Sequence, residues 1–288
     1  MSSIRIVVVD DSPLSVALIS DMLEQNDFEV VGSAGNLEEV KEVVAETKPD
    51  LVTMDMTMPG TDGLECTRAV HAIDPSIKVI VVSSMMDDEI VSQAKRNKIL
   101  GYVQKPVDED ELITLIKRIM LAEELFVALE QEYFEVFKDA LRDGMNRMTK
   151  TLLTYEREYI CEGEFAPEDI AIIVGIIGKF PGKMLLSLSK PSANVLVATI
   201  LKREPKDGDE VNNTLAEFAN IISGNACSIL NRKNRAYGLR VAPPSVLSGE
   251  NMLVNALNFP THTAVSKAVF GEMLLNVGFK RSDDDAWT

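Results

Sequence analysis

The first 122 residues alternate between short apolar runs and longer amphipathic stretches, and this alternation strongly constrains the fold. Five runs rich in β-branched residues are predicted as strands, at 4–9, 29–33, 51–54, 78–83 and 101–104. Stretches with helical spacing follow them, at 14–23, 37–47, 64–73, 87–97 and 109–122. Strands that alternate with helices form a parallel sheet covered on both faces, so we expect an α/β unit with a doubly wound five-stranded sheet.

The second half of the chain has a different pattern. Alternating runs at 169–178 and 183–189 flank Phe180-Pro181-Gly182, which predicts a β-hairpin. Two helices are expected at 191–203 and 209–232, and further strands at 253–259, 264–270 and 273–279. This order predicts an α+β domain whose helices pack on an antiparallel sheet. We expect the polar end, 282–288, to be disordered.

The segment between the two halves reads as helix. From Asp108 to Glu156 there is no proline, Gly144 is the only glycine, and apolar residues recur at spacings of three and four. One continuous helix or two helices with a kink near 120–128 fit this pattern equally well. We therefore assign residues 1–122 to the first domain, 123–128 to a helical connection, and 129–281 to the second domain.

Composition excludes several function classes. The formal net charge is −16, and residues 1–122 contain 11 basic and 22 acidic residues. Because phosphate binding needs a basic face, we expect no nucleic-acid partner. No apolar run approaches the length of a membrane span, and a signal peptide is not evident, so we expect a cytoplasmic protein without a membrane partner. Cys66, Cys161 and Cys227 are too scattered for a disulfide framework or a metal site.

Polar residues follow the predicted strands of the first half at the point where each ends. They are Asp10 and Asp11, Asp55, Ser83 and Lys105. Each alone fits an acidic helix start or a solvated loop, but together they should converge on one crevice at the carboxyl edge of the sheet. Clustered carboxylates repel unless a cation lies among them, and hard divalent ions such as Mg²⁺ suit this donor set. The residue types therefore favour phosphoryl transfer to Asp55.

These residues also carry a resemblance. Residues 1–122 resemble a CheY-like receiver domain in Asp10-Asp11, in Asp55 with Met58-Pro59-Gly60 and Asp62-Gly63, in Ser83 and in Lys105-Pro106. The resemblance implies that Asp55 accepts phosphate from a histidine kinase, and that Asp10, Asp11, Asp55 and the Thr57 carbonyl hold Mg²⁺. It also implies that Ser83 and Lys105 bind the phosphoryl oxygens and that Tyr102 is the aromatic switch residue.

One helix of the second half has an unusual polar face. At about 100° per residue, an apolar stripe faces one way, while Asn213, Glu217, Asn220 and Gly224 share the opposite side. Two polar groups beside a glycine would permit the close approach of another surface. The spacing alone, however, is more often that of an ordinary solvated helix face.

Glu217-Phe-Ala-Asn220-Ile-Ile-Ser-Gly224 resembles the Glu-x-x-Asn-x-x-x-Gly motif of the CheC/CheX family of chemotaxis phosphatases, in the single-copy form typical of CheX. The resemblance implies a hydrolase acting on phospho-aspartate, in which Glu217 contacts the receiver lysine and Asn220 holds a water in line with phosphorus. It also implies a homodimer.

Two hypotheses of function follow. In the first, the chain is a response regulator whose CheX-like half hydrolyses the aspartyl phosphate of its own receiver, of a partner copy or of a separate CheY-like protein. In the second, the CheX-like half is a non-enzymatic dimerisation or partner-binding output that Asp55 phosphorylation controls.

Overall fold

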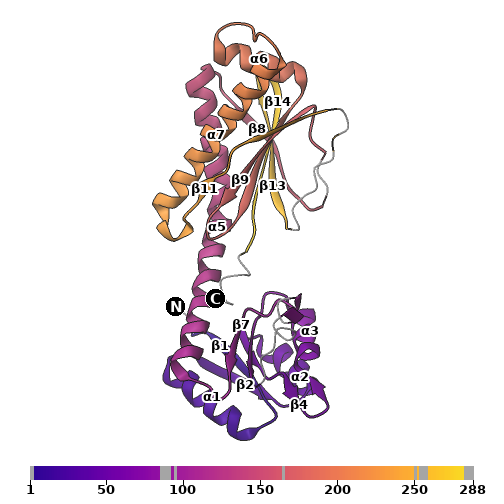
Figure 1. Ribbon diagram of the computed structural model, residues 1–288, viewed down its shortest axis with the longest axis vertical. Helices are drawn as coiled ribbons and strands as arrows, with labels where there is room; N and C mark the ends of the chain where they lie inside the picture. The colour runs from indigo at the N-terminus through magenta and orange to yellow at the C-terminus, as the bar shows by residue number, and fades with distance from the viewer. Residues whose placement is uncertain are drawn as a thin grey trace. The chain divides into compact units, whose positions relative to one another are not determined.

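The computed structural model describes residues 3–84, 92–93, 96–163, 166–249, 252 and 259–281. The chain divides into two compact units, one that ends at Ala122 and one that begins at Glu123 (Figure 1). Each unit is described by itself below.

The first unit is built on a five-stranded parallel sheet with the order β2-β1-β3-β6-β7. Its strands are β1 (Arg5–Val9), β2 (Glu29–Ala34), β3 (Leu51–Met54), β6 (Lys78–Ser83) and β7 (Gly101–Gln104). Fully buried apolar residues make up most of β1, β3 and β6, as expected for strands covered on both faces. The predicted α/β sheet is confirmed.

Helices cover both faces of this sheet. Side chains of α1 (Pro13–Gln25) and of the start of α5 (Glu109–Thr149) share one core with one face of the strands. Side chains of α2 (Leu37–Thr47) and α3 (Gly63–Ile73) share a second core with the other face. The order of the strands reverses between β1 and β3, which is where doubly wound sheets open a crevice at their carboxyl ends.

The described backbone from Glu109 to Thr149 is a single α-helix, α5, so the first of the two alternatives for this segment is correct. Its early residues, among them Leu112 and Ile116, belong to the core of the first unit. Its later residues, among them Leu129 and Phe137, belong to the core of the second. The apolar residues that recur at spacings of three and four along α5 therefore contribute to two separate cores.

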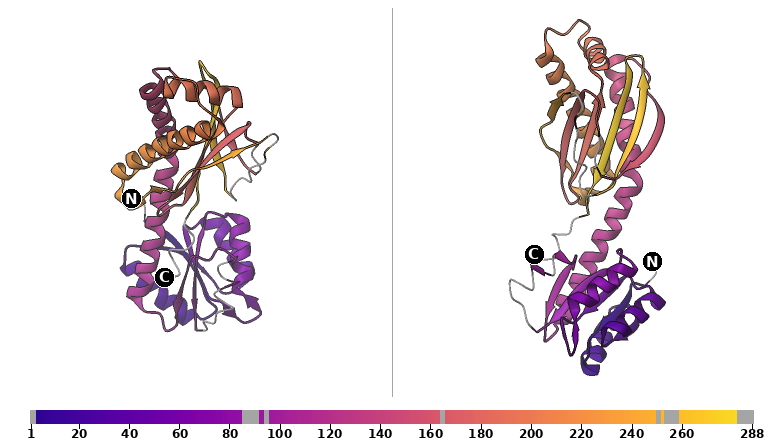
Figure 2. Two further views of the ribbon diagram at one scale, coloured as in Figure 1. Left: turned by 45° about the horizontal axis from the view of Figure 1, so that its top comes forward. Right: turned by 90° about the vertical axis from the view of Figure 1, so that its right-hand side faces the viewer.

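The second unit is an antiparallel sheet with helices. Its long path is β11-β9-β10-β14-β13-β8, and β12 also pairs with β9. The strands are β8 (Thr154–Cys161), β9 (Ile170–Ile177), β10 (Gly182–Leu188), β11 (Arg240–Val241), β12 (Ser245–Ser248), β13 (Thr261–Ala268) and β14 (Gly271–Phe279). The helices are α5, α6 (Lys190–Leu201), α7 (Gly208–Lys233) and the short 3₁₀ helix η1 (Arg235–Tyr237). Figure 2 shows these elements from two further directions.

One core holds the second unit together. It joins residues of α5, α6 and α7 to alternate residues of β9, β10 and β14, for example Ile172, Leu186 and Leu275. Because alternate strand residues face the same side, all three helices pack on one face of the sheet. The predicted α+β architecture is confirmed.

Several strands are absent from the sequence-based prediction. β8 pairs with β13, but most of its residues are exposed and its middle three are charged, so it lacks the apolar pattern of a strand. The two-residue strands β4 (Thr57–Met58) and β5 (Thr61–Asp62) form a hairpin too short for any periodicity to reveal. The predicted tail at 282–288, and most of the predicted elements at 87–97 and 253–259, lie outside the described residues.

The packing of α5 against α7 depends on Gly144. A Cβ built there would lie 2.0 Å from Ile222 Cδ1, and Ile222 is fully buried. At Gly224, in the middle of α7, a Cβ would meet nothing within 4 Å. The two positions therefore provide a matched pair for a test of packing.

We expect Gly144→Leu to lower the free energy of unfolding of the second unit by about 1–3 kcal/mol, because the added side chain overfills a closed core. Gly224→Leu should leave it unchanged or raise it by up to about 1 kcal/mol through helix propensity. Urea titration read by hydrogen exchange of α7 peptides reports this unit alone. Equal effects of the two substitutions would contradict the close packing at Gly144.

Candidate functional site

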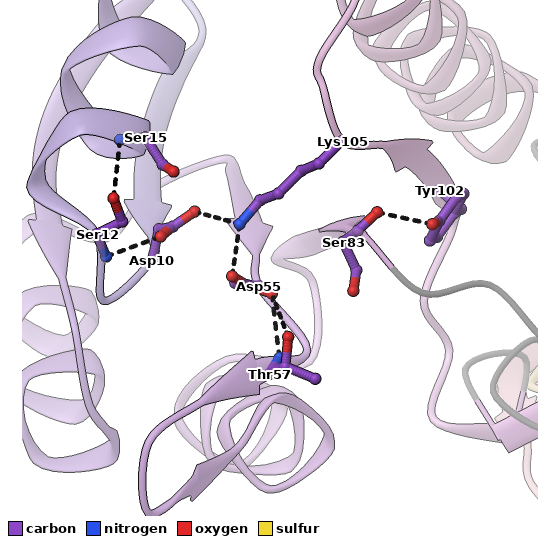
Figure 3. Close-up of polar contacts among 8 residues, drawn as sticks. All are labelled: Asp10, Ser12, Ser15, Asp55, Thr57, Ser83, Tyr102 and Lys105. Carbon is purple, nitrogen blue, oxygen red and sulfur yellow. Dashed lines mark hydrogen bonds and ion pairs between the residues drawn. The ribbon is translucent and has the colours of Figure 1, made fainter.

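The strand ends of the first unit bring together the polar residues that the sequence singled out (Figure 3). Asp10 follows β1, Asp55 follows β3, Ser83 ends β6 and Lys105 follows β7. The Lys105 ammonium lies 2.7 Å from Asp10 Oδ2 and 2.5 Å from Asp55 Oδ2. One cation thus bridges two carboxylates that belong to neighbouring strands of the sheet.

Local hydrogen bonds orient these carboxylates. The Ser12 amide donates to Asp10 Oδ1 at 2.9 Å, and the Thr57 amide donates to Asp55 Oδ1 at 3.1 Å. The Thr57 hydroxyl also donates to Asp55 Oδ1, at 3.4 Å. Each carboxylate therefore has one oxygen bound to nearby backbone and the other directed to Lys105.

The backbone after Asp55 depends on two glycines. Gly60, with φ +74°, forms the turn between β4 and β5, a conformation that glycine adopts without strain. A Cβ at Gly63 would lie 2.4 Å from the Asp55 carbonyl oxygen, so only glycine lets α3 begin this close to Asp55. Asp62 is the N-cap of α3 and accepts a hydrogen bond from the Leu64 amide.

The electrostatics of the cluster favour a cation. Asp10 and Asp55 are each only 4% exposed, whereas Asp11 is exposed. Each of the three carboxylates offers an oxygen atom within 4.8 Å of the others. Burial lowers the pKa of Lys105, but hydrogen bonds to Asp10 and Asp55 outweigh it, so the pKa is raised above its usual value.

Three hard oxygen donors on two strand ends fit a divalent ion such as Mg²⁺. Asp10, Asp11, Asp55 and the Thr57 carbonyl are the groups that would hold it. When bound, the ion would neutralise negative charge on phosphoryl oxygens.

Ser83 and Tyr102 occupy the other side of the cluster. Ser83 is fully buried, and its carbonyl oxygen accepts a hydrogen bond of 2.7 Å from the Tyr102 hydroxyl. Tyr102 is half-buried, and burial raises the pKa of its phenol. The aromatic residue proposed as a switch is therefore bonded directly to the end of the strand that carries Ser83.

The second candidate site is the polar face of α7. Leu215, Phe218, Ala219 and Ile222 are buried in the core, which confirms the predicted apolar stripe. On the other face, Asn213 and Glu217 are exposed, while Asn220 and Gly224 are half-buried. The predicted motif residues therefore share one accessible face.

The side chains of Glu217 and Asn220 have no polar partner in the part of the chain that the structure describes. Within the described ranges, the carboxylate of Glu217 forms no ion pair and the carboxamide of Asn220 forms no hydrogen bond. Gly224 leaves open space where a side chain would stand. An amide and a carboxylate beside this gap can approach another surface closely.

A groove adjoins this face on the side of Glu217. It has a volume of about 750 Å³ and lies between the ends of α5 and α6 and the first turns of α7. Phe218, Ile221 and Met148 contribute apolar surface, while Glu217 and Asp209 contribute carboxylates. Sequence reasoning did not predict this groove, because Met148 of α5 is remote from α7 along the chain.

Two protein-family models match the chain. A model described as the response regulator receiver domain matches residues 6–117, and a model described as chemotaxis phosphatase CheX matches residues 170–263. The chemotaxis protein CheY of Listeria monocytogenes is 35% identical over 115 residues, which cover 40% of this chain and 97% of that protein. CheY of Thermotoga maritima is 31% identical over 115 residues, which cover 40% of this chain and 96% of that protein.

The chain belongs to the response regulator receiver family. Its first unit is a CheY-like receiver domain, and a CheX-like domain is fused to it. Among solved structures, the chemotaxis protein CheX from Desulfovibrio desulfuricans is similar, with 21% identity and a TM-score of 0.47, covering 52% of this chain and 99% of that chain.

Receiver domains generally bind Mg²⁺ through acidic residues, and this receiver contains such a cluster. The role of each site residue stays a prediction, as do the homodimer and the absence of a nucleic-acid partner. Within the ranges that the structure describes, every helix is too short or too polar to cross a bilayer.

We expect Mg²⁺ at a hundred times its dissociation constant to stabilise the receiver domain by about 2.7 kcal/mol, because it binds only the folded carboxylate cluster. Asp11→Asn should remove most of this effect. Asp21→Asn, an equal charge change on the exposed surface of α1, should not. Hydrogen exchange of β3 peptides, with and without Mg²⁺, measures the difference, and equal responses of the two variants would contradict the site.

The raised pKa of Lys105 predicts that the stability of the folded receiver domain depends on pH. The ion pairs of Lys105 should stabilise the folded receiver fully below the unfolded lysine pKa of about 10.4, and this contribution is lost as the pH rises through the higher folded pKa. Titration of ¹³C-labelled lysine side chains by NMR should show Lys105 deprotonating later than exposed lysines. Asp55→Asn should bring its pKa back toward the ordinary value, and an unchanged pKa in that variant would refute the pairing.

Proposed function

We propose that this chain is a response regulator that is phosphorylated on Asp55, and that its CheX-like domain hydrolyses the aspartyl phosphate of a receiver. The observation that carries the proposal is the half-buried carboxamide of Asn220, which has no described partner and lies beside Glu217 and Gly224 on an accessible face. The family models support both halves of the proposal.

At the receiver, Asp55 is the phosphate acceptor. One of its carboxylate oxygens attacks the phosphorus of a phosphohistidine on a kinase, and the bond from phosphorus to the imidazole nitrogen breaks. Lys105, which forms ion pairs with Asp10 and Asp55 in this structure, then binds a phosphoryl oxygen. The Ser83 hydroxyl donates to another. The Thr57 amide, 3.1 Å from Asp55 Oδ1, keeps the acceptor carboxylate oriented.

At the CheX-like domain, Asn220 and Glu217 have different tasks. The Asn220 carboxamide enters the acidic pocket of a receiver and holds a water in line with the phosphorus–oxygen bond to aspartate. Water attacks phosphorus, that bond breaks, the aspartate carboxylate is restored, and the water protons leave with the phosphate. Because an amide is a poor base, the rate gain comes from orientation.

Glu217 binds the lysine of the receiver under attack, which is Lys105 when that receiver belongs to this chain. The ion pair would draw the lysine toward Glu217 and hold the acidic pocket open for Asn220. Three receivers are candidate substrates: that of the chain itself, that of a second copy in a homodimer, and a separate CheY-like protein. A histidine kinase is the partner that supplies the phosphate.

We expect Asn220→Ala to lengthen the half-life of phospho-aspartate by roughly a hundredfold relative to the wild type, because the water loses its orientation. Asn225→Ala is the matched control, since Asn225 is an exposed asparagine of the same helix on another face. The chain is phosphorylated with a small-molecule phosphodonor, and phosphate release is followed alone and with a stand-alone CheY-type receiver.

Asp55→Asn should abolish labelling of the chain itself while leaving activity on the stand-alone receiver. If Asn220→Ala leaves every half-life unchanged, the hydrolase reading is wrong. The CheX-like domain is then better described as a dimerising or partner-binding output.

A further inference from the structure

A pocket lined by arginines lies on α7 beyond the motif residues. It has a volume of about 640 Å³ and is lined by Gly224, Ser228, Asn231, Arg232, Arg235 and Arg240, among others. At about 100° per residue, Ser228 and Asn231 continue the face that carries Glu217, Asn220 and Gly224. The pocket is therefore an extension of the motif face toward the C-terminal end of the helix.

The pocket has an excess of positive charge in an acidic protein. Residues 218–249 contain no Asp or Glu, although the whole chain has a net charge of −16. Arg232, Arg235 and Arg240 are exposed, and none of their guanidinium groups forms an ion pair or hydrogen bond with a residue in the described ranges. Their neighbour Lys233 differs, because it pairs with Glu132 at 2.6 Å.

Tertiary structure assembles this charge. After α7 the chain turns through η1 and returns to β11, which brings Arg240 back to the helix (Figure 1). The Asn231 side chain fixes the segment between η1 and β11 to α7, since it donates to the Leu239 carbonyl at 2.7 Å and accepts from the Leu239 amide at 2.8 Å.

Helix capping does not account for the cluster. A cation in the last turn of a helix interacts favourably with the helix dipole, which explains Arg232. Arg240 lies on β11, outside the helix, and Arg235 lies in η1. Their convergence on one concave surface needs another explanation, and an anionic partner supplies one.

The proposed substrate has the complementary charge. The receiver domain of this chain holds 11 basic and 22 acidic residues. Asn220 and Asn231 are eleven residues apart on α7, or about 16 Å along the axis. A standard interface of about 800 Å² per partner is roughly 30 Å across, so a receiver centred on Asn220 would extend about 15 Å along α7 and reach the pocket at Gly224 and Ser228.

We propose that this arginine pocket, formed by Arg232, Arg235 and Arg240, docks the acidic surface of the receiver that Asn220 dephosphorylates. The inference rests on the proposed function and adds to it a determinant of partner choice. The pocket attracts the acidic receiver and orients it so that its phosphorylated aspartate reaches Asn220. It takes no part in the chemical step.

The test uses the full chain with Asp55→Asn, so that only an added receiver carries phosphate. A stand-alone CheY-type receiver, labelled with a small-molecule phosphodonor, is the substrate, and kcat and KM are measured at about 10 mM ionic strength, where the Debye length is about 30 Å. Arg235→Glu/Arg240→Glu should raise KM at least tenfold and leave kcat within about twofold. Arg232 is left unchanged because it also stabilises the helix end.

Arg157→Glu/Lys267→Glu is the control, since it removes two exposed cations from the paired strands β8 and β13. It should change KM far less. The difference between the two double variants should shrink as salt is added, because salt screens exposed charges.

The outcomes separate the two proposals. If Asn220→Ala abolishes turnover but the pocket variant has the KM of the control at every salt concentration, the docking proposal is overturned and the proposed function stands. If Asn220→Ala leaves the turnover of the phosphorylated receiver unchanged, the proposed function is wrong, and the docking proposal that rests on it is wrong as well. If the pocket variant alters inhibition by inorganic phosphate but not KM for the receiver, the pocket binds a small anion and the docking proposal is wrong.

Discussion

Two buried carboxylates that share one ammonium are the interaction on which the receiver site depends. Asp10 and Asp55 follow adjacent strands, and each is 4% exposed, so their negative charges repel in a region with little water. Lys105 reaches both and relieves this repulsion. The arrangement of the strand ends therefore depends on a single cation that contacts both carboxylates.

In the CheX-like domain, the candidate site lies on the two-sided helix α7, which has one buried face and one accessible face. One side of α7 supplies Leu215, Phe218 and Ile222 to the core, which fixes the helix rigidly. The other side carries Glu217 and Asn220, whose side chains form no hydrogen bond or ion pair with any residue that the structure describes. An acidic groove adjoins one end of this face and an arginine pocket adjoins the other. The two ends of the face therefore carry opposite charges.

Prediction from sequence worked best where burial on two sides left a strong pattern. The strands at 51–54 and 78–83 were predicted with the boundaries that the structure has, since most of their residues are apolar and nearly all are buried. The strand β8 was not predicted, for the opposite reason. Its residues Thr154–Cys161 are largely exposed, and only pairing with β13 makes them a strand. The short hairpin after Asp55 likewise has no periodicity of its own.

The sequence by itself determined the five parallel strands of the first unit, the strand ends that carry Asp10, Asp55, Ser83 and Lys105, and the helix face that carries Glu217 and Asn220, because local spacing controls all of these. Tertiary structure alone decided which groups meet. The ion pairs of Lys105 join residues 50 and 95 positions apart, and the arginine pocket forms only because η1 and β11 return to α7. Contacts between remote residues depend on how the elements pack, and no local pattern encodes that packing.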